Sequence, residues 1–332
     1  MSELVSTEKP ASVNTRFLLA IAAVLIVNSH LEAFYPVSFL AGDGLFGYAL
    51  FFFIAGIGLG LSAKRELRTF RDYYWRRFVR IYPTYWLFRL LFAMLDNDFA
   101  RMTPLQGLRI FVFPTETTFI GPLMVDYAVL YLLLRKGESA VIRRAIYWLM
   151  VPVVALWMYL LPHMQLMHSM PLYWLFAGII EFQMMLFGCY LGETVGPTRK
   201  YRFGWDSVAV IFIFGLYLAA RIGVQRGVLP PGTYPLLFAL LAGLFYFLFQ
   251  IACSYELDAI LKRVPRIGQL ITWVGVTTLE MYFVHQRVRV FTWVQAIVFP
   301  LNIVALWALS LPIAIAVEKL VTQFRKQYLK VN

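Results

Sequence analysis

Residues 44–62 read GLFGYALFFFIAGIGLGLS, a run of 19 residues without a single charge. A helix needs about 20 mostly apolar residues to cross the hydrocarbon core of a bilayer, so this run predicts a transmembrane helix. The composition of the whole 332-residue chain agrees, with 61% hydrophobic and 14% charged residues. Soluble domains are roughly 25% charged. The sequence therefore predicts an integral membrane protein.

Similar apolar runs, separated by short charged or Pro/Gly-marked loops, predict an all-α bundle of about ten transmembrane helices. The expected spans are residues 17–37, 44–62, 80–95, 118–134, 145–162, 171–191, 207–225, 235–253, 269–290 and 296–317. The run at 80–95 is the least apolar, because it starts in a basic stretch and contains Arg89. Residues 105–114 are too few to span, so we expect them to lie at the interface or to re-enter the bilayer.

The Lys and Arg residues fall mostly in alternate loops between these spans. Of the 30, most lie on one side, beginning with a dense cluster in residues 64–80. Because positive charge is retained in the cytoplasm, this predicts an even number of spans with both termini cytoplasmic. Residues 1–15 would be a short N-terminal segment and 319–332 a tail. The net charge of +12 then reflects topology rather than nucleic-acid binding, which needs a basic face on a soluble module.

Other features set limits on the class of protein. No repeat or linker divides the sequence, so we expect one domain over residues 1–332. The first apolar run lacks the cleavage site of a signal peptide, so we expect it to remain as the first span. Cys189 and Cys253 end apolar runs and are predicted to pack rather than to form disulfides. His163 and His168 lack partners at metal-ligand spacing. We therefore expect neither a metal nor a permanently bound cofactor.

Polar residues interrupt the first and ninth predicted spans. Asn28, Ser29, His30 and Glu32 lie in the run 17–37. In the ninth span the interrupting residues are Glu280, Tyr282 and His285, while Asp126 and Glu181 are carboxylates of the fourth and sixth spans. Ionisable groups within a membrane are costly and often functional, although a histidine can also serve as a packing contact between helices.

Two further patterns involve glycine and arginine. Gly56, Gly58 and Gly60 are spaced so that glycines four apart could let helices approach closely, which favours a packing role. Arg77 and Arg80 lie three apart in an aromatic-rich basic segment, residues 70–83. The segment fits an interfacial helix, and the two guanidinium groups fit an anion site. Both interpretations can hold.

In their order along the chain, these motifs resemble the acyltransferase 3 family of membrane-bound acyltransferases. The matching elements are His30 near the end of the first span, the aromatic-glycine run 50–60, Arg77-x-x-Arg80 followed by Ile81-Tyr82-Pro83, and LEMYFVH at 279–285. The sequence departs from the family pattern at three positions. Leu19 replaces the usual basic residue eleven positions before His30, Ala55 replaces the usual serine, and Asp126 matches the usual glutamate only loosely. Arg16, fourteen residues before His30, would lie on nearly the same helical face as that histidine.

The resemblance implies an enzyme of the inner membrane that moves an acyl group, most often acetyl, from cytoplasmic acyl-coenzyme A to a hydroxyl of a cell-surface or exopolysaccharide sugar. The implied partners are therefore acyl-CoA as co-substrate, a glycan or lipid-linked sugar as acceptor, and the bilayer. The resemblance implies His30 as the general base and an acyl-CoA site formed by Arg77, Arg80, Arg76 and Arg16. Possible second catalytic or orienting groups are Glu32, Tyr282 and His285. Possible acceptor-binding or structural groups are Asp126 and Glu280.

Three other interpretations remain open at this point. A transporter or flippase of lipid-linked glycans would also use buried charges, but it predicts broken helices that meet in pairs at mid-membrane. An enzyme of another acyltransferase group would use His285 rather than His30 as the base. A non-catalytic assembly subunit is the third. Transfer from acetyl-CoA without an ion gradient would separate the enzyme from the transporter.

Overall fold

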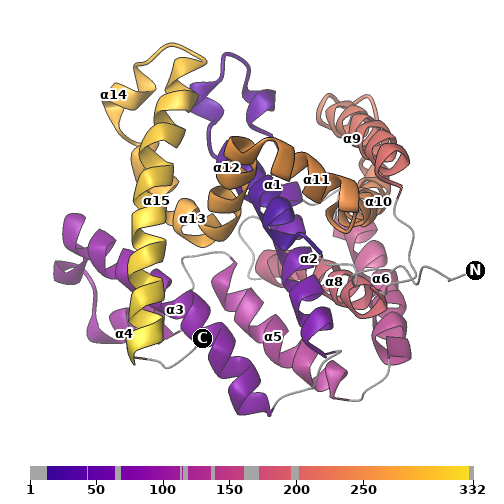
Figure 1. Ribbon diagram of the computed structural model, residues 1–332, viewed down its shortest axis with the longest axis horizontal. Helices are drawn as coiled ribbons and strands as arrows, with labels where there is room; N and C mark the ends of the chain where they lie inside the picture. The colour runs from indigo at the N-terminus through magenta and orange to yellow at the C-terminus, as the bar shows by residue number, and fades with distance from the viewer. Residues whose placement is uncertain are drawn as a thin grey trace, which may run out of the picture. The chain divides into compact units, whose positions relative to one another are not determined.

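A computed structural model describes residues 13–42, 44–63, 69–112, 114, 119–135, 139–160, 172–195 and 202–328, which form helices and no β-strand (Figure 1). The helices are α1 (Thr15–Asn28), α2 (Gly44–Ala63), α3 (Phe70–Leu95), α4 (Pro104–Val112), α5 (Ile120–Leu134), α6 (Ser139–Leu160), α8 (Leu172–Thr194), α9 (Phe203–Gln225), α10 (Tyr234–Ala252), α11 (Tyr255–Arg263), α12 (Pro265–Val276), α13 (Thr278–Val288), α14 (Thr292–Gln295) and α15 (Leu301–Tyr328). Short 3-10 turns lie between them: η1 (Glu32–Phe34), η2 (Ser38–Ala41), η3 (Asp98–Ala100) and η5 (Pro231–Thr233). The predicted all-helical class is confirmed for these residues. His163 and His168 lie outside them.

The described residues fall into two compact units, built from interleaved parts of the chain. The first unit takes residues within 1–18, 53–65 and 142–271. The second takes 19–52, 66–141 and 272–332. Each unit is considered by itself below, and the expectation of one domain over the whole chain stays a prediction.

Four of the described helices are long and apolar enough to cross a membrane, and a bent pair is a fifth candidate. The four are Gly44–Ala63, Phe203–Val224, Pro235–Ala252 and Leu301–Gln327, and the bent pair is Pro265–Val276 with Thr278–Val288. They correspond to the predicted spans 44–62, 207–225, 235–253, 296–317 and 269–290. The protein is thus an all-helical membrane protein with four or five candidate spans among its described residues, rather than the ten that we predicted.

The first predicted span, residues 17–37, is shorter than expected. Its helix α1 ends at Asn28 after 14 residues, a length of about 21 Å against a hydrocarbon core of roughly 30 Å. Polar side chains at the helix end explain the stop, because such groups bond locally to the backbone and compete with helix continuation. The Ser29 hydroxyl donates to the Ile26 carbonyl at 2.8 Å. As a result, His30 lies in a turn beyond the helix.

The ninth predicted span, residues 269–290, is not one straight helix. It consists of α12 and α13, which are bent by 83° on either side of Thr277. The Thr277 hydroxyl donates to the Trp273 carbonyl at 2.8 Å, and the Thr278 hydroxyl lies 2.9 Å from the Gly275 carbonyl. Hydroxyls that bond back to the preceding turn favour bending, and periodicity of apolar residues does not reveal such a break.

Within the first unit, α2 contacts α8 through the glycines that the sequence singled out. A Cβ atom at Gly56 would lie 1.9 Å from the Met185 carbonyl oxygen, and one at Gly60 would lie 2.2 Å from the Cys189 carbonyl oxygen. A Cβ at Gly58 would meet nothing within 4 Å. The predicted packing role is therefore confirmed for Gly56 and Gly60, whereas Gly58 faces open space.

Helix α8 contributes a matching pair of glycines to this contact. A Cβ at Gly188 would lie 1.9 Å from the Phe53 carbonyl oxygen, and one at Gly192 would lie 2.5 Å from that of Ile57. Since both helices advance in the same direction along the contact, α2 and α8 are parallel there. Small residues on both sides allow the two backbones to touch. Cys189 in this contact is buried, and Cys253 is buried as well, so their predicted packing role is confirmed.

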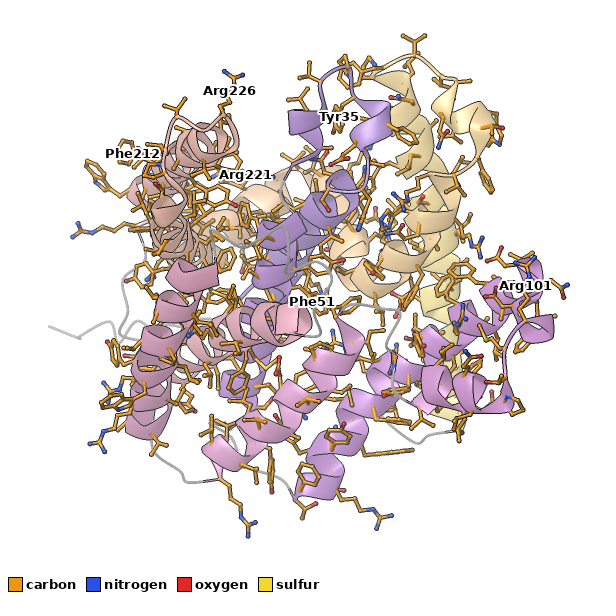
Figure 2. All side chains as sticks on the ribbon, turned by 180° about the vertical axis from the view of Figure 1, so that it is seen from behind. Tyr35, Phe51, Arg101, Phe212, Arg221 and Arg226 are labelled. Atoms are coloured by element: carbon orange, nitrogen blue, oxygen red, sulfur yellow. The ribbon has the colours of Figure 1, made fainter. Side chains whose placement is uncertain are left out.

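Helices α9 and α10 pack together in the same unit. The outer side of α9 carries Phe212, which is 64% exposed (Figure 2). A helix that is apolar and yet exposed in this way fits a surface that faces lipid. Asn14 joins the start of the chain to this unit, because its Nδ2 donates to Asp258 at 3.1 Å and its backbone N donates to the Ala252 carbonyl at 2.7 Å.

In the second unit, α3 begins ten residues before the predicted span 80–95. Thr69 caps the helix, since its hydroxyl oxygen accepts from the backbone N of Asp72 at 3.3 Å. An acidic residue in the first turn favours the positive end of the helix. The whole basic segment 70–83 is therefore helical, and Arg77 and Arg80 share one helix.

Helix α4 covers most of the short apolar segment at 105–114, and side chains of α3 cap its C-terminal end. The Tyr85 hydroxyl donates to the Ile110 carbonyl at 2.8 Å, and the Trp86 indole donates to the Phe111 carbonyl at 2.9 Å. The Tyr82 hydroxyl donates to the Val112 carbonyl at 3.0 Å. The last carbonyls of a helix lack partners within the helix, so these aromatic donors fix α4 against α3.

The last helix, α15, continues to Tyr328 beyond the predicted end at residue 317. Side-chain contacts one and two turns apart support the extension, because the Thr322 hydroxyl donates to Glu318 at 2.7 Å and Arg325 lies 3.8 Å from the same carboxylate. Figure 1 shows α15 beside α13 in this unit, and the two helices pack together. This packing places α13 inside the second unit.

Candidate active site

His30 lies in the turn between α1 and η1, in the second unit, and the loop around it is fixed by several hydrogen bonds. The Asn28 side chain donates to the Leu40 carbonyl at 2.8 Å and accepts from the Tyr35 hydroxyl. The buried Asn302 side chain donates to the Phe34 carbonyl at 2.9 Å. These bonds hold a non-helical segment in one conformation, so the half-buried His30 ring has a defined position.

His285 on α13 contacts His30 directly. The His285 Nε2 and the His30 Nδ1 are 3.0 Å apart, and the His285 Nδ1 is 2.6 Å from the Met281 carbonyl oxygen. A carbonyl oxygen only accepts, so the His285 Nδ1 carries a proton, and the neutral ring then presents a lone pair at Nε2. It follows that the His30 Nδ1 donates to His285. Neutral His30 therefore has its own lone pair on Nε2, the nitrogen that faces away from His285.

Tyr282 and other aromatic rings surround the histidine pair. The Tyr282 ring meets the His30 ring edge to face, with 6.3 Å between centroids. Tyr282 also contacts Phe119 at 4.8 Å and Tyr48 at 6.5 Å. The rings of Tyr282, Phe119 and Tyr48 thus form an apolar wall on one side of His30, which would lower the local water content around a reacting group.

Two arginines follow His285, and they have different surroundings. Arg289 donates from Nη1 to the His30 carbonyl at 3.2 Å. Arg287 pairs with Asp96, to which it donates from Nη1 at 3.0 Å and from Nη2, and its guanidinium lies over the Phe92 ring at 4.3 Å. The hydrogen bond from Arg287 lowers the pKa of the Asp96 carboxyl. Arg287 thus connects two helix ends, whereas Arg289 lies beside the histidines.

Glu280 lies on the same helix but has a different partner. Its Oε1 accepts from the Thr84 hydroxyl at 2.9 Å, and both side chains are buried. Because buried polar groups are costly unless they are hydrogen-bonded, this contact ties α13 to α3. Of the two roles predicted for Glu280, acceptor binding and structural support, this contact favours structural support.

The basic segment on α3 presents its arginines in two ways. The Arg77 guanidinium lies over the Tyr73 ring at 3.6 Å, is 5.3 Å from the Tyr127 ring, and donates to the Tyr73 carbonyl. Arg76 and Arg80 are exposed. One guanidinium is therefore held in place by aromatic rings, while its neighbours remain accessible to an anionic ligand.

The remaining predicted residues are not joined to the histidine pair by any described contact. Glu32 is exposed on η1, and within the described ranges no hydrogen bond or ion pair joins it to His30. Asp126 is buried on α5, and Arg16 is exposed in the first unit. In the same described ranges, no three His, Cys, Asp or Glu side chains are grouped closely enough to hold a metal ion.

Sequence reasoning missed two residues that shape this site. Arg289 is four residues after His285, a spacing that places both on one helical face and could have indicated their proximity. Asn302 is a single buried amide in the apolar run that starts α15, which is the kind of residue that marks an interhelical contact. Local sequence does not reveal that Asn302 bonds to the Phe34 carbonyl or that Arg289 bonds to the His30 carbonyl.

Comparison with known proteins adds one finding. No curated protein and no solved structure matches the chain. A family model described as an acyltransferase domain matches residues 17–319, nearly the whole chain. This match confirms the resemblance that the sequence motifs suggested: the chain belongs to the acyltransferase 3 family.

Proposed function

We propose that this membrane acyltransferase moves an acetyl group from cytoplasmic acetyl-CoA to a hydroxyl of a cell-surface or exopolysaccharide sugar, with His30 as the general base. The observation that carries the proposal is the hydrogen-bonded pair His30 and His285, which leaves the His30 Nε2 as a free base. The family match supports the reaction class. The glycan acceptor and the coenzyme donor rest on the family resemblance.

His30 acts in both halves of the reaction. Its Nε2 takes the proton of the sugar hydroxyl while the oxygen attacks the thioester carbonyl, and the collapse of the intermediate breaks the carbon–sulfur bond. The protonated ring then gives the proton to the departing thiolate of coenzyme A. His285 accepts from the His30 Nδ1 throughout, so it is a positioning residue that fixes the tautomer of the base.

The arginines of α3 hold the coenzyme. Acyl-CoA carries phosphate groups, and guanidinium groups bind phosphates through paired charge-assisted hydrogen bonds. Arg80 and Arg76 are exposed and can reach a ligand. Arg77 is oriented by Tyr73 and Tyr127, which reduces the side-chain entropy lost on binding. The expectation that Arg16 also binds acyl-CoA stays a prediction from the sequence.

We propose that the chain lies in the inner membrane and crosses it an even number of times, with both termini in the cytoplasm. The distribution of basic residues supports this topology, and four or five described helices already meet the criteria for a span. Helices α1 and α5 are apolar but have only 14 and 15 residues. Short helices of this kind can cross where the bilayer thins or where flanking residues reach the interface.

A transporter or flippase of lipid-linked glycans is the second candidate, and the bend between α12 and α13 is the observation that favours it. Such proteins use broken helices that meet in pairs at the substrate site. The described part of the chain contains one bent pair, and its second half carries the His285 contact to His30. One break next to a base fits an enzyme better than the paired arrangement of a transporter.

The test is acetyl transfer by purified protein in lipid nanodiscs without an ion gradient. Acetyl-CoA and surface glycan from a strain lacking the protein are supplied, and release of the coenzyme thiol is followed together with acetylation of the glycan. The variant His30→Gln is expected to lose about 10²- to 10⁴-fold in rate, with acetyl-CoA binding retained. A fully active His30→Gln enzyme would remove this residue from the mechanism.

Two variants of the neighbouring histidine separate orientation from bulk packing. In His285→Gln the amide oxygen can still accept from the His30 Nδ1, so substantial activity is expected. In His285→Leu no acceptor remains, and the rate should fall towards that of His30→Gln. Equal activity of the Gln and Leu variants would contradict the proposed role of His285. Movement of glycan without consumption of acetyl-CoA would favour the transporter.

A further inference from the structure

Arg289 is a cation beside the histidine pair that has no described acidic partner. Its Nη1 donates to the His30 carbonyl at 3.2 Å, and no ion pair joins it to a carboxylate among the residues that the structure describes. Its Nε is buried without a hydrogen-bond partner in that same part of the chain. A guanidinium has five N–H donors, so several remain available for a ligand.

Local hydrogen bonds fix the backbone from which the Arg289 side chain extends. The backbone N of Arg289 donates to the His285 carbonyl at 2.9 Å, so Arg289 continues the helical geometry of α13 and stands one turn above His285 on the same face. The Gln295 side chain donates to the Arg289 carbonyl at 2.7 Å. The backbone of Arg289 is thus held by hydrogen bonds at both its N and its carbonyl, close to His30.

Arg287, two residues earlier, shows what an arginine with a structural role looks like in this helix. It makes two hydrogen bonds to the carboxylate of Asp96 and covers the Phe92 ring. Within the described ranges Arg289 has no equivalent arrangement, although a buried or half-buried cation is costly unless it is paired. An anion that forms only during the reaction would provide the missing partner.

We propose that Arg289 is a catalytic residue that donates a hydrogen bond to the thioester carbonyl oxygen as this oxygen becomes negatively charged. The inference rests on the proposed function, in which the sugar oxygen attacks the carbonyl carbon and His30 takes the hydroxyl proton. The electron pair of the carbonyl double bond moves to its oxygen, where Arg289 stabilises it. The pair then returns, the carbon–sulfur bond breaks, and the thiolate takes the proton from His30. Hydrogen-bond donors aimed at such a developing charge lower the activation barrier more than most other catalytic groups do.

The experiment compares Arg289→Gln, Arg289→Lys and the control Arg287→Gln in the nanodisc assay, with acetyl-CoA and surface glycan from a strain lacking the protein. Loss of one donor to an oxyanion costs about 10²- to 10³-fold in kcat, so Arg289→Gln should fall by that factor with an unchanged KM for acetyl-CoA. Arg289→Lys keeps a charge and a donor and should recover part of the rate. Arg287→Gln removes the same charge two residues away and should stay within about threefold of the parent.

A second donor substrate separates stabilisation of the oxyanion from mere support of the His30 loop. Fluoroacetyl-CoA is close to acetyl-CoA in size, but its fluorine withdraws electrons and itself stabilises the oxyanion. The ratio of the rate with fluoroacetyl-CoA to the rate with acetyl-CoA should therefore rise in Arg289→Gln. An unchanged ratio, or a rate within threefold of the parent, would overturn the inference while leaving His30 as the base. Absence of acetyl transfer by the parent protein in the same assay would instead remove the proposed function itself.

Discussion

At the scale of single residues, the two arginines of the R-x-x-R motif are not equivalent. Arg80 is exposed, whereas Arg77 lies over the Tyr73 ring and donates to the carbonyl of the same residue. A cation held over an aromatic face is stabilised by about 0.5–2 kcal/mol. The Tyr127 ring on α5 is 5.3 Å from the same guanidinium, so Arg77 contributes to the packing of α3 on α5 in addition to its proposed contact with the coenzyme.

The variants Arg77→Ala and Arg80→Ala should each weaken binding of acetyl-CoA. A hydrogen bond to a charged group contributes about 1.5–3 kcal/mol, which corresponds to roughly a 10- to 100-fold increase in Kd. Lysine should restore only part of the affinity, because it cannot bind phosphate in a bidentate manner. Isothermal titration calorimetry with acetyl-CoA measures the effect, and the exposed Arg71 on the same helix provides the control variant Arg71→Ala. An unchanged Kd in the double alanine variant would mean that the arginines serve membrane topology alone.

At the scale of helices, close contact and sharp bends depend on small or hydroxylated residues. Gly56 and Gly188 bring the backbones of α2 and α8 together. Thr277 and Thr278 bend the polypeptide by satisfying carbonyls at the end of α12. Both features occur in stretches that read as ordinary apolar runs, so hydropathy alone would assign them to uninterrupted spans.

The glycine contact can be tested with a matched pair of substitutions on one helix. Gly56→Ala would place a methyl group 1.9 Å from the Met185 carbonyl oxygen, and overpacking of this kind costs about 1–3 kcal/mol or more. Gly58→Ala meets nothing within 4 Å, and alanine is favoured over glycine in a helix interior by about 0.5–1 kcal/mol. Thermal unfolding in detergent should show a lower Tm for the first variant and an equal or higher Tm for the second. Equal melting temperatures would contradict the close backbone contact.

At the scale of the whole molecule, the asymmetric distribution of positive charge predicts an even number of crossings with cytoplasmic termini. Reporter fusions after residues 98, 166 and 230 should report the outer side, and fusions after residues 140, 200 and 260 the cytoplasm. The measurement is the ratio of alkaline phosphatase to fluorescent-protein signal in intact cells. Opposite readings at two or more sites would overturn the topology.

Membrane class, helical secondary structure and the basic segment were predictable from sequence alone. Hydropathy and charge act locally and additively, so a run such as 44–62 is apolar wherever it lies in the fold. His30 and His285 could also be singled out, because ionisable residues are rare in apolar runs. Short helices such as α1 were predicted too long, since hydropathy does not register local bonds like that of the Ser29 hydroxyl.

Only the tertiary structure joined these residues into a site. His30 and His285 are 255 positions apart in sequence yet share a hydrogen bond, and Arg289 bonds to the His30 carbonyl over a similar separation. Such pairings depend on how α13 packs and on the bend between α12 and α13. Many contacts between distant segments together determine that packing. The sequence by itself determined that this is a helical membrane protein with two unusual histidines. The packing of the second unit decided that the two histidines share a hydrogen bond and which nitrogen of His30 faces away from His285.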